Sequence, residues 1–163
     1  MTLKIYNSLS KKVEEFKPIN PLEVKIYSCG PTVYDYAHIG NFRAYIFSDL
    51  VHRVLKYNGY NVKLIMNLTD IDDKTIRNSR EKQLSIKEYT DIYKKAFFED
   101  VDKLKIIRAY KYPSAAEHIP EMVDIIKKLL ESGHAYRSDD SVYFKISSFK
   151  DYGKLSGIKQ EDI

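Results

Sequence analysis

The sequence has no tryptophan and a single cysteine, Cys29, among its 163 residues. One cysteine cannot form a disulfide within the chain, so the thiol either packs as a small hydrophobic group or serves metal or redox chemistry. The frequency with which free cysteines are buried favours packing. No segment approaches about 18 consecutive apolar residues, and the N-terminus lacks the basic head and apolar run of a signal peptide. We therefore expect a cytoplasmic protein that makes no contact with a membrane.

The chain also has little excess of one sign of charge over the other. Hydrophobic residues make up 44% of the chain and charged residues 31%, with a net charge of only +4. This composition is ordinary for a globular domain with one hydrophobic core. The mild positive charge permits an anionic partner such as RNA but does not require one.

Short apolar runs at Val24–Ser28 and Val62–Leu68 are typical of buried strands. Between them, apolar residues recur at three- and four-residue steps, which predicts an amphipathic helix that ends at Asn58-Gly59. A strand, a helix and a strand in this order indicate a right-handed crossover with parallel pairing, which is half of an α/β nucleotide-binding fold. The helix face expected to be buried consists of Ile39, Phe42, Ile46, Leu50, Val54 and Tyr57.

Further elements are predicted on both sides of this unit. Ser85 and Glu88 form a capping box that opens a second long helix, whose lysines are expected to face solvent. Tyr112-Pro113-Ser114 predicts a turn, and Pro120 suits the first turn of a third helix. The second helix is expected to bury Ile86, Tyr89, Tyr93, Phe97, Val101 and Leu104, and short strands are expected at Leu3–Tyr6, Val13–Phe16, Ala135–Arg137 and Val142–Ile146, the last two as a hairpin.

The residues best suited to bind a ligand or take part in a reaction lie between the first strand and the first helix. Cys29-Gly30 follows the strand, and His38-Ile39-Gly40-Asn41 opens the helix. Open α/β sheets bind ligands at this position, and the free N–H groups and dipole of a helix N-terminus attract phosphate. His38 and Asn41 share one helical turn and can face the same anion. In the alternative interpretation they only cap the helix, and Gly40 only packs against a strand.

A second polar segment, Asn67–Lys74, begins where the second strand should end, at the same edge of the sheet. Its carboxylates could bind a divalent ion, but Asp70 or Asp72 as a helix cap explains them equally well. Thr69 is the better candidate for a ligand contact. No histidine stands at a recognisable ligand spacing from Cys29, so the spacing predicts no complete metal site.

The stretch from Tyr27 to Asn41, followed by Asn67–Asp73, closely resembles the opening of the cysteinyl-tRNA synthetase family, which belongs to the class I aminoacyl-tRNA synthetases. The resemblance covers nearly the whole chain. It implies an α/β fold, namely the first half of a class I Rossmann-like domain with parallel strands and flanking helices over residues 1–110. The start of a connective-peptide insertion, a helix and a β-hairpin, is implied over residues 111–163. The resemblance continues through Glu117–Met122, Gly133–Tyr136 and Tyr152–Gly157.

The resemblance also implies a reaction and a site. A full-length monomer would activate L-cysteine with ATP and Mg²⁺, forming cysteinyl-adenylate, and transfer the cysteinyl group to the 3′ end of tRNA(Cys). His38 and Asn41 would belong to the HIGH signature and stabilise charge on the α-phosphate. Asn41 stands where that signature has histidine and cannot become cationic, so its share should be smaller or differently placed. The implied ATP-binding residues are Pro31, Thr32, His38, Ile39, Gly40 and Asn41, and the implied amino-acid-binding residues are Cys29, Gly30 and Thr69.

Cys29 would also be one of four zinc ligands, and the zinc would take the thiolate of the substrate cysteine. The family's other three ligands, its KMSKS loop and its anticodon-binding region lie in a second half that these 163 residues do not contain. We therefore expect an N-terminal fragment that binds zinc and ATP weakly and does not aminoacylate alone. Three alternatives stay open: a nucleotidyltransferase of the phosphopantetheine adenylyltransferase kind, the cysteine ligase of mycothiol synthesis, and a non-catalytic nucleotide- or RNA-binding module.

Overall fold

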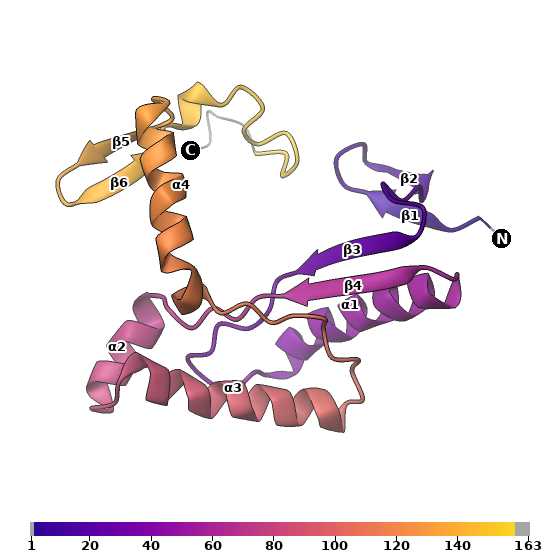
Figure 1. Cartoon of the computed structure of the whole chain (residues 1–163), viewed down its shortest axis with the longest axis horizontal. Helices are drawn as coiled ribbons and strands as arrows, with labels where there is room; N and C mark the ends of the chain where they lie inside the picture. Colours follow the sequence, from indigo (N-terminus) through magenta and orange to yellow (C-terminus); the bar gives the residue numbers. More distant parts are fainter. Residues whose placement is uncertain (1, 159–163) are drawn as a thin grey trace. The chain divides into compact units, whose positions relative to one another are not determined.

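The computed structural model describes residues 2–158, which form two compact units. Residues 17–118 make up one unit, and the segments before residue 17 and after residue 118 make up the other. The elements of the first unit are β3 (Glu23–Ser28), α1 (Ile39–Tyr57), β4 (Asn61–Met66), α2 (Asp73–Glu81), α3 (Ile86–Lys103) and the 3₁₀ helix η1 (Ala115–His118) (Figure 1). The domain boundary expected between residues 110 and 111 stays a prediction.

Strands β3 and β4 pair in parallel, in a register that runs from Glu23 opposite Asn61 to Ser28 opposite Met66. The predicted order of strand, helix and parallel strand is therefore confirmed. Helix α1 ends where the sequence indicates, with Asn58 as its C-cap and Gly59 at a φ of 87°.

A third extended segment, residues 110–114, runs beside β4 and forms parallel bridges with it at Lys111 and beyond its end at Ser114. The Tyr110 N–H donates to the Leu64 carbonyl at 2.7 Å, and the Leu68 N–H donates to the Pro113 carbonyl at 2.8 Å. The turn predicted at Tyr112-Pro113-Ser114 is therefore wrong. Proline lacks an N–H donor, but at the edge of a sheet its carbonyl can still accept from the neighbouring strand.

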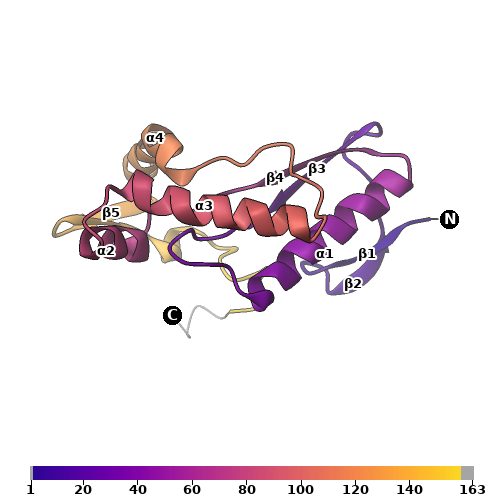
Figure 2. The ribbon, with the colours of Figure 1, turned by 90° about the horizontal axis from the view of Figure 1, so that it is seen from below.

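Helices α1 and α3 lie on the same side of the β3–β4 pair (Figures 1 and 2). Side chains from both helices and from β4 meet there in one apolar cluster, which places the core directly beneath the ends of the strands. Its buried members are Phe42, Tyr45, Met66, Leu68, Phe97, Val101 and Ile106.

The buried face of α1 differs from the predicted one. Of the predicted residues only Phe42 is buried, whereas Ile39 and Tyr57 are 82% and 93% exposed. The helix carries apolar residues on more than one face, and periodicity alone does not say which face meets the sheet. The observed face includes two polar residues that sequence patterning assigns to solvent. Its members are Phe42, Tyr45, Asp49, His52 and Leu55.

Asp49 is buried on α1, where its carboxylate connects the helix to the turn after α3. Its Oδ1 atom accepts the Ile107 N–H at 3.0 Å, and its Oδ2 atom pairs with Arg53 at 2.7 Å. Arg53 in turn donates to the Lys105 carbonyl. These contacts satisfy the buried carboxylate, as burial of a charge requires.

Helix α3 begins with the predicted capping box. Glu88 Oε2 accepts the Ser85 N–H at 3.0 Å, and Ser85 Oγ accepts the Glu88 N–H at 3.2 Å. Tyr89, Phe97 and other predicted residues of this helix face the core, but Leu104 is 46% exposed, so its assignment to the buried face is wrong. Leu104 is the C-cap of α3 and lies beyond the last helical turn.

The second unit contains two antiparallel hairpins and a helix. Strand β1 (Lys4–Asn7) pairs with β2 (Lys12–Glu15), and β5 (Ala135–Ser138) pairs with β6 (Ser141–Phe144). The last predicted strand is too long, because residues Ile146–Ser148 form the 3₁₀ helix η2. Helix α4 (Ile119–Glu131) carries Pro120 in its first turn, as predicted. Among the described residues, no helix combines the length and the apolar character that a membrane crossing needs.

Candidate active site

The two polar segments predicted at one sheet edge do meet there. The Gly30 N–H donates to Asn67 Oδ1 at 3.1 Å. Further on, the Val33 N–H donates to the Thr69 carbonyl, and the Thr69 N–H donates to the Pro31 carbonyl, each at 3.0 Å. These bonds continue the pairing of β3 and β4 beyond the ends of the strands and hold the two segments side by side.

Gly30 is required by the closeness of this approach. A Cβ atom at this position would lie 1.9 Å from the Asn67 carbonyl oxygen and 2.8 Å from Met66 Cγ. Any larger residue would therefore push the two strand ends apart.

The N-terminus of α1 is closed by a reciprocal cap. His38 Nδ1 accepts the Gly40 N–H at 3.0 Å, and Asn41 Oδ1 accepts the His38 N–H at 3.0 Å. Because Nδ1 is an acceptor, the neutral imidazole carries its proton on Nε2, and the amide of Asn41 keeps its NH₂ group as a donor. The cap thus leaves His38 and Asn41 with one free N–H donor group each. His38 and Asn41 therefore do cap the helix, and this cap is compatible with ligand binding.

The packing interpretation of Gly40 is wrong. A Cβ atom there would meet the His38 ring, with Cε1 at 2.8 Å, and no strand lies within 4 Å. Gly40 therefore leaves the His38 ring free to lie back over the first turn of the helix.

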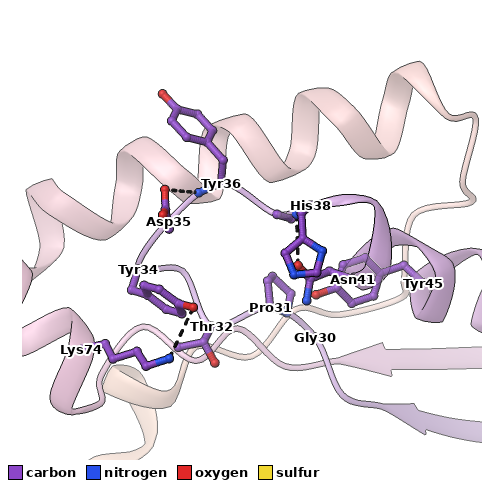
Figure 3. A pocket seen from close by; sticks show the side chains of 11 residues that line it. Gly30, Pro31, Thr32, Tyr34, Asp35, Tyr36, His38, Asn41, Tyr45 and Lys74 are labelled. Atoms are coloured by element: carbon purple, nitrogen blue, oxygen red, sulfur yellow. Dashed lines mark hydrogen bonds between the residues drawn. The ribbon is translucent and has the colours of Figure 1, made fainter.

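A cavity of about 380 Å³ lies between the strand ends and the N-terminus of α1. This volume falls within the usual range for small-molecule sites, about 300–1,000 Å³. Figure 3 shows His38, Asn41 and Tyr45 on one side of the cavity, with Tyr34 and Lys74 on the other. The lining residues are Gly30, Pro31, Thr32, Tyr34, Asp35, Tyr36, Ala37, His38, Asn41, Tyr45 and Lys74.

Four residues expected at the site do not line this cavity, namely Cys29, Ile39, Gly40 and Thr69. Ile39 points to solvent, and Cys29 is exposed at the end of β3. Thr69 is half-buried, and its Oγ1 accepts from Asn67 Nδ2 at 3.0 Å. The packing interpretation of Cys29 is wrong, because an exposed thiol does not fill a core.

Lys74 and Tyr45 are cavity residues that sequence reasoning missed. The Lys74 ammonium, in the first turn of α2, lies 4.5 Å from the Tyr34 ring centroid and 3.4 Å from its hydroxyl. Burial, and to a smaller extent the nearby Cys29, raises the pKa of Tyr45 to about 12, so this phenol is protonated at neutral pH. Position in the first turn of a helix after a strand end could have singled out Lys74, but no sequence signal marks Tyr45.

The acidic segment after β4 serves the fold. Asp72 caps α2 by accepting the Thr75 N–H at 2.8 Å, which confirms the capping interpretation. Asp70 is 4% exposed and accepts from Lys94 Nζ at 2.7 Å and from the Ala116 N–H at 2.9 Å. Ser114 Oγ donates to the same carboxylate. The prediction that the lysines of α3 face solvent is therefore wrong for Lys94.

Parallel strand ends and a helix N-terminus around one cavity define a Rossmann-like nucleotide-binding domain. A family model described as "tRNA synthetases class I (C) catalytic domain" matches residues 15–163. The chain therefore belongs to the family of class I synthetase catalytic domains that this description names.

Individual relatives agree with this family. A cysteine–tRNA ligase of Brachyspira hyodysenteriae is 60% identical over 97% of this chain and 33% of the relative. A cysteine–tRNA ligase of Methanosarcina acetivorans is 49% identical over 99% of this chain and 34% of the relative. The chain thus spans about a third of the length of the curated relatives it matches.

A solved structure shows the same fold at low sequence identity. Mycobacterium tuberculosis methionyl-tRNA synthetase in complex with methionyl-adenylate matches with a TM-score of 0.63 and 14% identity. The match covers 71% of this chain and 23% of that chain. The predicted class I α/β fold is confirmed.

Proposed function

We propose that this chain provides part of the catalytic domain of a cysteine–tRNA ligase. That enzyme uses ATP to convert L-cysteine to cysteinyl-adenylate and then transfers the cysteinyl group to the 3′ end of tRNA(Cys). The names of the relatives support the substrate. The observation that carries the proposal is the cavity where the strand ends meet and where His38 and Asn41 each have a free N–H donor group.

In the first step, a carboxylate oxygen of cysteine attacks the α-phosphorus of ATP, and the bond to pyrophosphate breaks. Negative charge grows on the α-phosphoryl oxygens. N–H donors that are already oriented stabilise such charge without further reorganisation. His38 Nε2 and the Asn41 amide are oriented in this way by their cap. Pro31 and Thr32 line the cavity beside His38. Gly40, which has no Cβ to displace the His38 ring, is proposed to leave room for adenosine.

Cys29, Gly30 and Thr69 are the residues that we propose for the amino acid. The exposed thiol of Cys29 fits the role of one zinc ligand, because a thiolate is a preferred donor for zinc. Within residues 2–158 no group of three or more candidate ligands surrounds it, so the described residues do not by themselves hold the metal. A bound zinc would take the thiolate of the substrate and reject serine, since a hydroxyl is a much weaker ligand.

The direct test is cysteine-dependent exchange of pyrophosphate with ATP by the full-length gene product, followed by charging of tRNA(Cys). Loss of one donor to a developing oxyanion typically costs about 10²- to 10³-fold in rate, so we expect His38→Ala to slow exchange to this extent. His134→Ala is the matched control, because this histidine bonds Ser148 in the other compact unit. Equal exchange by the two variants, or no cysteine-dependent exchange by the parent protein, would contradict the proposal.

A non-catalytic binding module is the second candidate. The observation in its favour is an exposed apolar stripe on α1, which includes Phe47 at 65% and Leu50 at 55% exposure. ATP binding without pyrophosphate exchange would favour the module. Transfer of cysteine to an amino sugar in place of tRNA would favour the mycothiol ligase.

A further inference from the structure

Tyr45 is a polar residue inside an apolar cluster. Its ring packs edge-on against Phe42, with centroids 5.5 Å apart, and against Phe97, at 5.4 Å. The residue is only 5% exposed. A phenylalanine would make the same packing contacts, so the core does not account for the hydroxyl.

The hydroxyl of Tyr45 makes no hydrogen bond with any residue in the described part of the chain. The hydroxyl oxygen itself is not sealed off, because the buried side-chain atom without a partner in the described part of the chain is His52 Nδ1 and not the Tyr45 oxygen. A polar atom that has no protein partner but keeps an accessible surface is available to a ligand. Tyr45 lines the cavity, and Figure 3 shows it beside Asn41. Because its ring is enclosed by Phe42 and Phe97, the hydroxyl at the tip of the side chain is the part that reaches the cavity.

The position of Tyr45 within the cavity indicates which part of the bound substrates its hydroxyl would contact. Asn41 and Tyr45 are four residues apart on α1 and therefore lie on the same face of the helix. Gly30 lines the same cavity, and Figure 3 shows it near Asn41 and Tyr45. Tyr45 is thus close both to Gly30, proposed for the amino acid, and to Asn41, proposed for ATP.

We propose that the Tyr45 hydroxyl donates a hydrogen bond to an anionic oxygen at the junction of the two substrates, where the carboxylate of cysteine meets the α-phosphate of ATP. This inference rests on the proposed function. A phenol is a donor at neutral pH, and a carboxylate or phosphate oxygen is the strongest acceptor that the reaction supplies. Tyr45 is therefore an additional catalytic residue of the activation step.

Tyr45→Phe tests the assignment because it removes only the oxygen. Hydrogen bonds to charged groups have strengths that correspond to a loss of about 10- to 100-fold, and we expect this loss in the kcat/KM of pyrophosphate exchange by the full-length gene product. Tyr57→Phe is the matched control, since it deletes the same atom from a residue of the same helix that is 93% exposed. The thermal unfolding midpoints of both variants should match the parent, which a purely structural role for the hydroxyl would not allow.

The outcomes separate this inference from the proposed function. Exchange by Tyr45→Phe that equals exchange by Tyr57→Phe, in an active parent protein, overturns the role of Tyr45 and leaves the function intact. A defect confined to the transfer of cysteine to tRNA also overturns it, because the hydroxyl would then serve the RNA end. No cysteine-dependent exchange by the parent protein overturns the proposed function and the assignment together.

Discussion

Replacing Asp70 by asparagine removes the charge at the centre of a buried network. This carboxylate follows directly on Thr69, and it connects the end of β4 to Lys94 on α3 and to Ser114 and Ala116 on the neighbouring segment. The amide introduced by Asp70→Asn could still accept one hydrogen bond. It could not balance the ammonium of Lys94.

The burial of the pair sets the size of the effect. Removing one partner of a buried ion pair costs about 3–5 kcal/mol, because the other charge is left uncompensated. The Lys94 side chain keeps 20% of its exposure, and Asp91 lies 3.8 Å from its Nζ atom. We therefore expect Asp70→Asn to lower the free energy of unfolding by about 2–3 kcal/mol, somewhat less than a fully buried pair would cost.

Urea unfolding followed by tyrosine fluorescence measures this loss, since the chain has 14 tyrosines and no tryptophan. Asp100→Asn is the control, because it breaks an exposed ion pair with Lys103 on the same helix. Exposed pairs contribute little, so the control should lose less than about 0.5 kcal/mol. If the two variants unfold at the same urea concentration, the network around Asp70 does not stabilise the fold.

The pH dependence of the same loss provides a second check. Burial raises the pKa of Asp70, but the hydrogen bonds from Lys94, Ser114 and Ala116 outweigh it and hold the pKa below its usual value. A carboxylate with a lowered pKa in the folded state stabilises the protein above the unfolded-state pKa, about 4, and loses this contribution as the pH falls through the folded-state value. The gap between the parent protein and Asp70→Asn should therefore be constant between about pH 5 and 7 and shrink below about pH 4. A gap that stays unchanged in acid would refute this reasoning.

Two further substitutions test the region around the cavity. Gly30→Ala places a Cβ atom 1.9 Å from the Asn67 carbonyl oxygen, whereas Gly59→Ala meets nothing within 4 Å and strains only a φ of +87°. In urea unfolding we expect Gly30→Ala to lower the free energy of unfolding by about 2–4 kcal/mol and the control Gly59→Ala to lower it by about 1 kcal/mol. Equal losses for the two variants would mean that the strand ends can separate without cost. Tyr89→Phe removes a 2.6 Å hydrogen bond to the Tyr34 carbonyl, which ties α3 to the loop before α1. We expect a loss of about 1 kcal/mol, and an unchanged melting temperature would argue against this tie.

The sequence alone determined the local features of this protein. The capping box of Ser85 and Glu88, the Asn58-Gly59 helix end and the parallel pairing of β3 with β4 all follow from neighbouring residues or from the order of elements. Local hydrogen bonds and side-chain periodicity suffice for such features. The meeting of Gly30 with Asn67 also followed, because parallel strands end at one edge of a sheet.

The tertiary structure alone decided which helix faces are buried and which distant side chains pair with one another. Helix α1 has apolar residues on several faces, and only packing against β4 and α3 selects the face with Tyr45 and Asp49. Asp70 and Lys94 are 24 residues apart in sequence, and no local pattern pairs them. Contacts between residues distant in sequence depend on how the elements pack together. For this reason the cavity, with Lys74 beside Tyr34 and the hydroxyl of Tyr45 at its wall, became visible only in the folded chain.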